Sequence, residues 1–313
     1  MHPAFSVIFL TTLIGAGQGL FVAIYTAQWV ERLGWLPVGV ARDFDIAGTM
    51  ISMALTIGGL LASFFHLGRP ERAWRSAARW RTSWLSREVI ALPAFLGATG
   101  FYGAAMYLHF ASPLAAGAPA ALACLALFVC TGMVYAGIRF LREWASPLTL
   151  VNFALLGCAS GFTIAAALST RIAPELFVFM ANGAVALTVA GLATRTASLV
   201  RNARLKPKST LQSAVGIRHP RIVQIAQGFM GGSFNTREFF HGVGARAMRS
   251  IRSFFLAAAF VLPIALLGFA LVSSTPALAI VAALVQAAGL IAERWYFLAQ
   301  ANHPQNLYYQ SQA

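Results

Sequence analysis

Charged residues are scarce in this sequence, and their scarcity excludes a soluble domain of ordinary composition. Only 10% of the 313 residues are Asp, Glu, Lys or Arg, whereas 58% are hydrophobic. A soluble protein of this length needs a charged surface that such a composition cannot supply. The 27 glycines also suit membrane helices, where glycine is commoner than in soluble helices. The sequence therefore predicts an integral membrane protein with a single membrane domain over residues 1–313.

Negative charge is much scarcer than positive charge, and the sequence places all nine carboxylates in loops or near the ends of apolar runs. Proton pumps and many ion-coupled transporters keep ionisable groups at mid-membrane depth. The apolar runs of this chain hold uncharged polar residues instead, among them Gln18, Asn152, Asn182 and Gln286. We therefore expect no proton wire across the membrane and chemistry on one face only.

Cysteine is also rare, which argues against metal ligation by this chain. Cys124, Cys130 and Cys158 lie inside apolar runs without metal-ligand spacing. A bis-histidine haem would need two histidines on different spans at similar depth. His109 lies at the opposite end of its span from His66, and the other histidines lie outside the spans. We expect neither a haem nor an iron–sulfur cluster in this chain.

Eight apolar segments are long enough to cross a bilayer, which takes roughly 20 residues each. Proline, serine and charged residues bound them. The predicted fold is an all-α, polytopic bundle of about eight transmembrane helices, and seven is the main alternative count. The segments lie near residues 5–30, 46–66, 88–109, 118–139, 147–169, 175–196, 253–273 and 277–299.

The positive charges predict the orientation of the bundle. An even number of spans puts both termini on one face, and the opposite face has only Arg32, Arg42 and Arg171 of the 23 basic residues. Basic residues concentrate on the cytoplasmic side of membrane proteins, so both termini are predicted to be cytoplasmic. The basic residues that give the net charge of +14 are explained by their role in orienting the bundle, so we expect no binding to nucleic acid.

The segment from His66 to Glu88 is the most informative part of the chain. Arginines at helical spacing beside tryptophans predict an amphipathic helix near residues 69–82 that lies among the lipid headgroups. Ser86 is the expected cap of the third span, which would place Glu88 in its first turn. His66 ends the second span, so His66 and Glu88 are expected at the same membrane depth.

A histidine and a carboxylate facing an apolar pocket at the interface suit a quinone. The histidine can hydrogen-bond a quinone carbonyl, and the carboxylate can exchange a proton with water. The ordinary alternatives stay open on these residues alone. An interfacial histidine often bonds a helix-end carbonyl, a glutamate in a first turn favours the helix dipole, and arginines here can contact anionic lipid.

The run HLGRPERAW at His66–Trp74, followed by TSWLSRE ending at Glu88, closely resembles the membrane anchor subunits of the dimethyl sulfoxide reductase family. The resemblance covers nearly the whole chain. It implies a bacterial inner-membrane subunit that holds a molybdopterin catalytic subunit and an iron–sulfur subunit and exchanges electrons with ubiquinone or menaquinone. It also implies that His66 and Glu88 form the quinone site, with Arg69, Arg72 and Trp84 in the same motif.

The long connection near residues 199–252 is predicted to dock a partner. Its glycines and phenylalanines make a poor solvated linker and indicate apolar anchors. A loop folded back on its own bundle is the alternative. The candidate docking residues are Phe229, Phe234, Arg237, Phe239, Phe240 and His241.

This loop and the cytoplasmic basic face make the chain look like the membrane subunit of the cytoplasmic-facing sulfite dehydrogenases. That resemblance implies a non-catalytic subunit that passes electrons from sulfite oxidation to quinone and has no activity alone. The alternatives are a quinol-oxidising anchor of a dimethyl sulfoxide reductase-type complex, a purely structural anchor, and a secondary transporter. A transporter would predict internal repeats and charged residues inside the spans.

Overall fold

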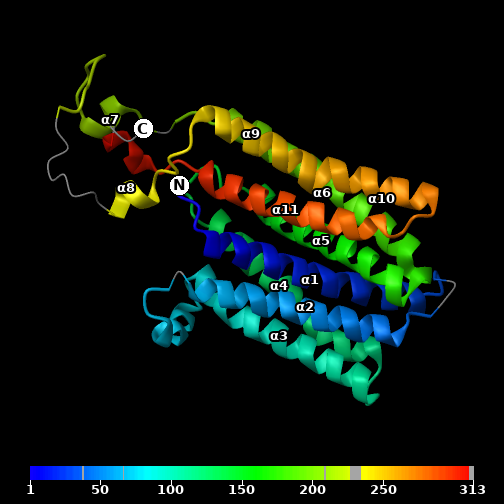
Figure 1. The fold of residues 1–313 in the computed structure, drawn as a ribbon. Helices are drawn as coiled ribbons and strands as arrows, with labels where there is room; N and C mark the ends of the chain where they lie inside the picture. The colour runs from blue at the N-terminus through cyan, green and yellow to red at the C-terminus, as the bar shows by residue number, and fades with distance from the viewer. Residues whose placement is uncertain (37–38, 66, 208, 226–233, 310–313) are drawn as a thin grey trace.

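The computed structural model describes residues 1–36, 39–65, 67–207, 209–225 and 234–309 (Figure 1). Most of this part of the chain is helical and it contains no strand, so the predicted all-α class is confirmed. The α-helices are α1 Phe5–Arg32, α2 Arg42–Phe64, α3 Trp84–Leu108, α4 Pro113–Ala136, α5 Pro147–Ile172, α6 Phe177–Ala203, α7 Leu211–Val215, α8 Phe234–Glu238, α9 Ala245–Leu256, α10 Leu262–Ser273 and α11 Leu278–Ala299. The 3-10 helices are η1 Pro70–Arg79, η2 Pro174–Leu176 and η4 Pro304–Tyr308, and η3 Ala257–Val261 is a π-helix.

Within the described residues, eight helices are long and apolar enough to cross a membrane, and the predicted count is confirmed. The sixth runs over Pro174–Ala203 and the seventh over Ala245–Ser273, each longer than the sequence predicted. The long connection is therefore shorter than expected and covers 204–244. Apolar runs end at the first charged residue, whereas helices continue into the basic, interfacial turns that follow.

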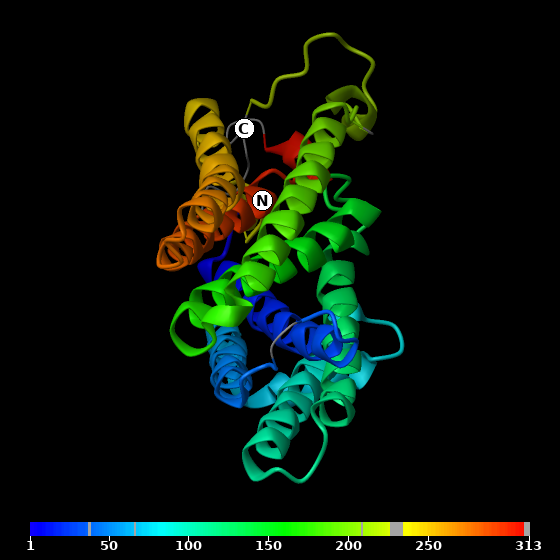
Figure 2. The same cartoon turned by 90° about the vertical axis from the view of Figure 1, so that its right-hand side faces the viewer.

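Helices α1 and α5 lie side by side at the centre of the bundle. Helices α2, α3 and α4 pack on one side of this pair, and α6, α10 and α11 on the other (Figures 1 and 2). Gly19 and Gly161 allow the close approach, because a Cβ atom on either would collide with the backbone of the facing helix. Small residues are a common way to bring membrane helices together.

The seventh span contains a π-turn whose cause is local. Pro263 has no backbone N–H and cannot donate to the carbonyl of Ala259 one turn earlier. The side chain of Gln286 on α11 donates to this carbonyl at 3.3 Å. The helix therefore continues through η3, with a neighbouring helix supplying the missing donor.

The predicted interfacial helix is present, but it is a 3-10 helix over Pro70–Arg79 at the end of the bundle that carries the N-terminus (Figure 1). None of its residues is buried. Trp74 and Trp80 are 71% and 51% exposed, and the guanidiniums of Arg75 and Arg81 lie over their rings. Exposed tryptophan with stacked arginine is the composition expected among lipid headgroups.

Candidate functional site

Glu88 lies in the second turn of α3, and this helix begins at the end of the bundle that carries the N-terminus (Figure 1). The helix begins at Trp84 because the side chain of Ser83 caps it, accepting a hydrogen bond from the Ser86 amide at 3.3 Å. The prediction that Ser86 caps the span is therefore wrong by three residues. Ser86 is instead buried inside the first turn, and Glu88 is moved one turn deeper than expected.

The carboxyl group of Glu88 is buried, with 9% of the residue exposed. Thr131 on α4 donates its hydroxyl proton to Oε1 of Glu88 at 2.6 Å. The ion pairs among the described residues do not include Glu88. A buried carboxyl with a neutral donor and no cation partner is costly as a structural element alone, since burial of a charge without a partner is unfavourable. Its place at a membrane interface makes it a candidate proton donor or acceptor.

Trp84 lies one turn before Glu88 and packs against the same neighbouring helix. A Cβ atom added at Gly137, which directly follows α4, would come within 3.3 Å of the Trp84 ring. The Arg87 guanidinium lies 4.2 Å from the centre of this ring and donates to the carbonyls of Trp80 and Arg81 at 2.8 and 2.9 Å. Arg87 thus ties the chain that leaves η1 to the start of α3, which fixes the position of Trp84 beside the site.

The structure brings together two of the five predicted quinone-site residues, Trp84 and Glu88. Arg69 and Arg72 are exposed, and the ion pair that Arg72 makes with Glu71 is a long one of 3.8 Å. His66 lies outside the described residues, and its pairing with Glu88 stays a prediction. The sequence motif indicated the N-terminal end of α3, but it could not separate the side chains that turn inward from those on the surface.

The predicted docking segment folds against the two ends of its own chain. Phe239 is 9% exposed and stacks on His303, with ring centres 3.8 Å apart. The rings of Phe240 and His241 lie beside Tyr309 and Trp295. Arg237 is exposed, and Phe229 and the side chain of Phe234 lie outside the described residues. The alternative of a loop folded back on its bundle therefore applies to Phe239–His241, and a docking role stays a prediction.

The N-terminal amino group helps to hold this segment. It donates to the carbonyl of Ala301 at 2.7 Å, and the amide of His2 donates to the carbonyl of Glu238 at 2.8 Å. Burial lowers the pKa of the amino group to about 6, against the opposing charge of Glu143. Burial also lowers the pKa of His241 and of His303, and the nearby N-terminus adds to both effects. When neutral, these groups favour the arrangement in which Phe239–His241 lie against the two ends of the chain, which we call the closed form.

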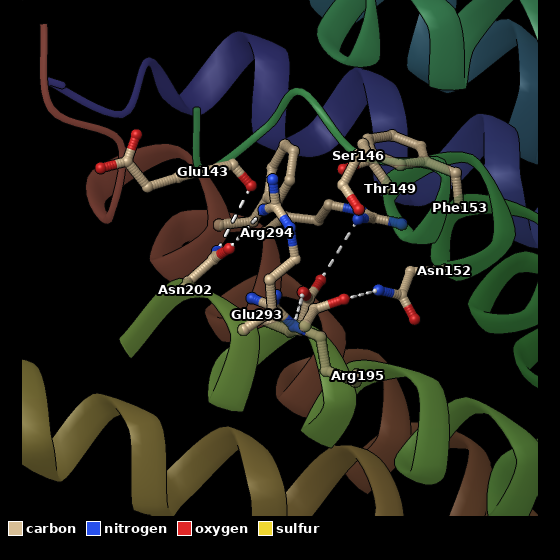
Figure 3. A pocket seen from close by; sticks show the side chains of 12 residues that line it. Glu143, Ser146, Thr149, Asn152, Phe153, Arg195, Asn202, Glu293 and Arg294 are labelled. Atoms are coloured by element: carbon tan, nitrogen blue, oxygen red, sulfur yellow. Dashed lines mark hydrogen bonds and ion pairs between the residues drawn. The ribbon is translucent and has the colours of Figure 1, made fainter. Parts of the chain in front are cut away.

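A buried ion cluster between α6 and α11 was missed by the sequence analysis (Figure 3). Nε of Arg195 lies 2.7 Å from Oε1 of Glu293, and Nη1 of Arg294 lies 3.3 Å from Oε2. The three side chains are 2%, 1% and 6% exposed. The Arg294 guanidinium also lies 3.8 Å from the centre of the Phe153 ring. Arg195 and Glu293 are therefore buried within α6 and α11, whereas the sequence placed every carboxylate in a loop or near the end of an apolar run.

The cluster surrounds a small polar cavity of about 10 Å³. That is the space one water molecule needs. Asn152 on α5 donates to the Ser198 hydroxyl at 2.8 Å, whereas Oδ1 of Asn152 has no partner among the described residues. Figure 3 shows Glu143 and Asn202 joined at the rim, where Nδ2 of Asn202 donates to the Glu143 carbonyl at 3.3 Å. The mutual pairing of the charges is typical of a structural element.

Metal ligation is not indicated by the described residues, among which no group of three His, Cys, Asp or Glu side chains comes together.

Comparison with known proteins matches nearly the whole chain. Residues 1–309 match the model of the family described as DMSO reductase anchor subunit (DmsC). The chain is also similar to a subunit of the sulfite dehydrogenase of Allochromatium vinosum, with 52% identity over 326 aligned residues that cover 100% of both chains. Both matches extend far beyond the segment around Glu88.

Proposed function

The chain belongs to the DMSO reductase anchor subunit family, and from this premise we propose that it is the quinone-reactive membrane subunit of a sulfite-oxidising complex. A molybdopterin subunit and an iron–sulfur subunit on the cytoplasmic face would oxidise sulfite. This chain would hold them at the inner membrane and deliver their electrons to ubiquinone or menaquinone. Isolated from these partners, the chain would have no activity.

The observation that supports a quinone site most directly is the buried carboxyl of Glu88, bonded to Thr131 beside Trp84. Reduction of a quinone to a quinol takes two electrons and two protons. The electrons would come from the iron–sulfur partner, and sulfite oxidation with one water releases two electrons and two protons as sulfate forms. Glu88 would pass protons from the cytoplasmic face to the quinone oxygen, and Thr131 would hold the carboxyl in place. His66 would hydrogen-bond a quinone carbonyl, as the family resemblance implies.

Sulfite as the electron source is supported by the similarity to the sulfite dehydrogenase of Allochromatium vinosum and by the basic face at the termini. The positive-inside rule favours a cytoplasmic position for this face, and Glu88 would then lie near the cytoplasmic side of the bundle. In a quinol-oxidising reductase of the outward-facing type, the same face would point to the periplasm. The family name leaves this second candidate in place, and the side of the membrane on which the partners lie separates the two.

A transporter is less well supported. The buried Arg195–Glu293–Arg294 cluster does place charges inside the spans, as a transporter would. However, these charges pair with one another instead of lining an open path, and the family match covers residues 1–309. The Arg195–Glu293–Arg294 cluster is better explained as a structural contact that holds α6 and α11 together.

The test is to delete this chain from the complex and to follow the catalytic subunits. The proposal predicts that a molybdopterin subunit without an export signal, together with an iron–sulfur subunit, co-purifies with the tagged chain. After deletion, sulfite oxidation with an artificial electron acceptor should persist in the soluble fraction, while quinone-linked oxidation is lost. Exported partners would favour the reductase, and the absence of both partners would contradict an anchor function.

A further inference from the structure

A second polar site lies at the opposite end of the bundle from the termini, far from Glu88. The ends of α1 and α3 and the beginnings of α2 and α4 enclose a pocket of about 650 Å³. This volume is in the range of small-molecule sites. The polar and charged lining of the pocket comes from α1, α2 and the connection between α3 and α4, and it includes Gln28, Glu31, Arg42, Asp45, His109 and Ser112.

Asp45 is the innermost charged group of this pocket. It is 4% exposed, in the first turn of α2. Nε2 of Gln28 donates to Oδ2 of Asp45 at 2.8 Å and is also in contact with the Tyr102 hydroxyl. The other two oxygens, Oδ1 of Asp45 and Oε1 of Gln28, are buried without a hydrogen-bond partner among the described residues. Buried polar atoms rarely remain unpaired, so these two oxygens call for a donor that the described side chains do not supply.

The charged groups that face the pocket do not neutralise Asp45. Glu31 and Arg32 come from the end of α1, Arg42 from α2 and His109 from the end of α3. Nε of Arg42 donates to the carbonyl of Met106 at 2.9 Å instead. No ion pair among the described residues includes Asp45. An unpaired carboxylate is costly to bury, and water in the pocket is the simplest group that could solvate it.

Unpaired hydroxyls continue inward from Asp45. Thr49 lies one turn further along α2 and faces Gly103 on α3, where an added Cβ atom would come within 3.0 Å of the Thr49 methyl group. Thr99 lies one turn further inward on α3. Neither hydroxyl has a partner among the described residues. Leu92 and Phe95, 5% and 0% exposed, then occupy α3 between this region and Glu88. The polar region therefore reaches inward from the opposite face and ends at an apolar barrier.

We propose that this pocket is an aqueous inlet through which Asp45 binds and releases protons from the compartment opposite the termini. A hydronium ion gives its proton to the carboxylate and leaves as water, and the reverse step restores the carboxylate. Water donates to Oδ1 of Asp45 and Oε1 of Gln28. A metal cation is a poorer fit, because two free oxygens fall short of the roughly six that hard cations take. Each face of the bundle thus has its own buried carboxyl.

Access of water is tested by cysteine labelling in membrane vesicles that carry the complete complex. Cys124, Cys130 and Cys158 are first replaced with alanine. Single variants Asp45→Cys, Gln28→Cys and Ser112→Cys are then treated with a small, charged, membrane-impermeant thiosulfonate from each side. Gln305→Cys, exposed beside the C-terminus, reports which side carries the termini. Thr163→Cys is the buried control, because Thr163 is 0% exposed on α5.

The inlet predicts that Asp45→Cys and Gln28→Cys are labelled from the face opposite Gln305→Cys, as Ser112→Cys is, and that Thr163→Cys stays unlabelled. If Asp45→Cys does not fold, Gln28→Cys decides alone. Labelling of Ser112→Cys without labelling of either inner position would overturn the proposal, and so would labelling of the inner positions from the termini side. Neither result depends on quinone activity, so a failure here is distinct from a failure of the proposed function.

Proton binding is tested by infrared spectroscopy of the purified complex, comparing the wild type with Asp45→Asn. The expected result is a carboxylic-acid C=O band, present at acidic pH in the wild type, that is lost in the variant. This band should shift when the solvent is replaced with D2O, because an inlet exchanges its protons with bulk water. Identical spectra at every pH, or a band that does not shift in D2O, would overturn the proposal.

Discussion

Glu88 and Glu293 are both buried glutamates at the same end of the bundle, and they differ in what surrounds them. Glu293 lies between two arginines, with one oxygen 2.7 Å from Arg195 and the other 3.3 Å from Arg294. Glu88 has one neutral partner, Thr131 at 2.6 Å. Removing one member of a buried ion cluster leaves its partners uncompensated and is costly, whereas a buried carboxyl without a cation partner can change its protonation. The difference favours a structural role for Glu293 and supports the proposed proton-transfer role for Glu88.

The largest expected effect comes from breaking the structural member of this pair. Glu293→Gln leaves two buried guanidiniums without a counter-charge and should cost about 3–5 kcal/mol of stability. The thermal unfolding of the purified complex in detergent measures this loss. Glu88→Gln, which keeps an oxygen for Thr131, is the matched control and should unfold near the wild-type temperature. Equal destabilisation of the two variants would contradict the distinction.

The second prediction concerns the hydroxyl that holds Glu88. Thr131→Val keeps the shape of the side chain but removes a donor, which should weaken the local structure by about 1 kcal/mol and slow quinone-linked turnover several-fold. Thr163→Val is the control, because the Thr163 hydroxyl donates to the carbonyl of Ala159 in its own helix at 2.9 Å. Turnover that falls equally in both variants would mean that the Thr131–Glu88 bond has no special role.

Docking of the partners should depend on the exposed charge of the loop more than on its rings. Arg237→Glu reverses an exposed charge and should reduce co-purification of the iron–sulfur subunit, most strongly at low salt. Arg221→Glu, also exposed but in another part of the same connection, is the control. Unchanged co-purification of Arg237→Glu would remove this residue from the docking surface.

The smallest expected effect is a pH dependence of the segment held by the N-terminus. The pKa of the Met1 amino group is about 6 in the closed form, against 8.0 for an exposed one, and the pKa of His241 and of His303 is also lowered. The open form therefore binds more protons than the closed form as the pH falls from about 8 to 6, so acidification favours opening.

Hydrogen exchange of the Phe239 amide, which donates to the carbonyl of Asn235 at 2.9 Å, measures this opening. After correction for the intrinsic pH dependence of exchange, its protection should decrease on acidification. The Gly137 amide, bonded to Met133 within the same bundle at 2.9 Å, should show no such change. Protection that stays constant for Phe239 would show that these groups do not control the segment.

The membrane architecture could be predicted because each span depends on the composition of one continuous stretch of sequence. Each span is an apolar run of sufficient length, so the sequence alone indicates eight helices and the approximate place of each. The sequence also indicated Glu88, because a local motif marks the beginning of α3. The exact depth of Glu88 was missed by one turn, since Ser83 and Ser86 are both plausible caps and only the fold selects between them.

The buried ion cluster could not be predicted in the same way, because it depends on a contact between distant parts of the chain. Arg195 follows the apolar core of the sixth span and resembles the first residue of a basic loop. Only the packing of α6 and α11 against α5 places it next to Glu293. Two signals were available, a carboxylate and an arginine inside the apolar run of α11, where charges are rare. The fold-back of Phe239 onto His303 is likewise a contact between distant segments.

The most direct test of the account is the activity of the Glu88→Gln complex with two electron acceptors. A buried general acid–base group predicts that quinone-linked sulfite oxidation falls by about a hundredfold or more, while oxidation with an artificial acceptor that bypasses this chain is unchanged. Glu143→Gln, a partly exposed glutamate at the same end of the bundle, should leave both activities intact. Equal loss of both activities in Glu88→Gln, or full retention of the quinone-linked one, would contradict a proton-transfer role for Glu88.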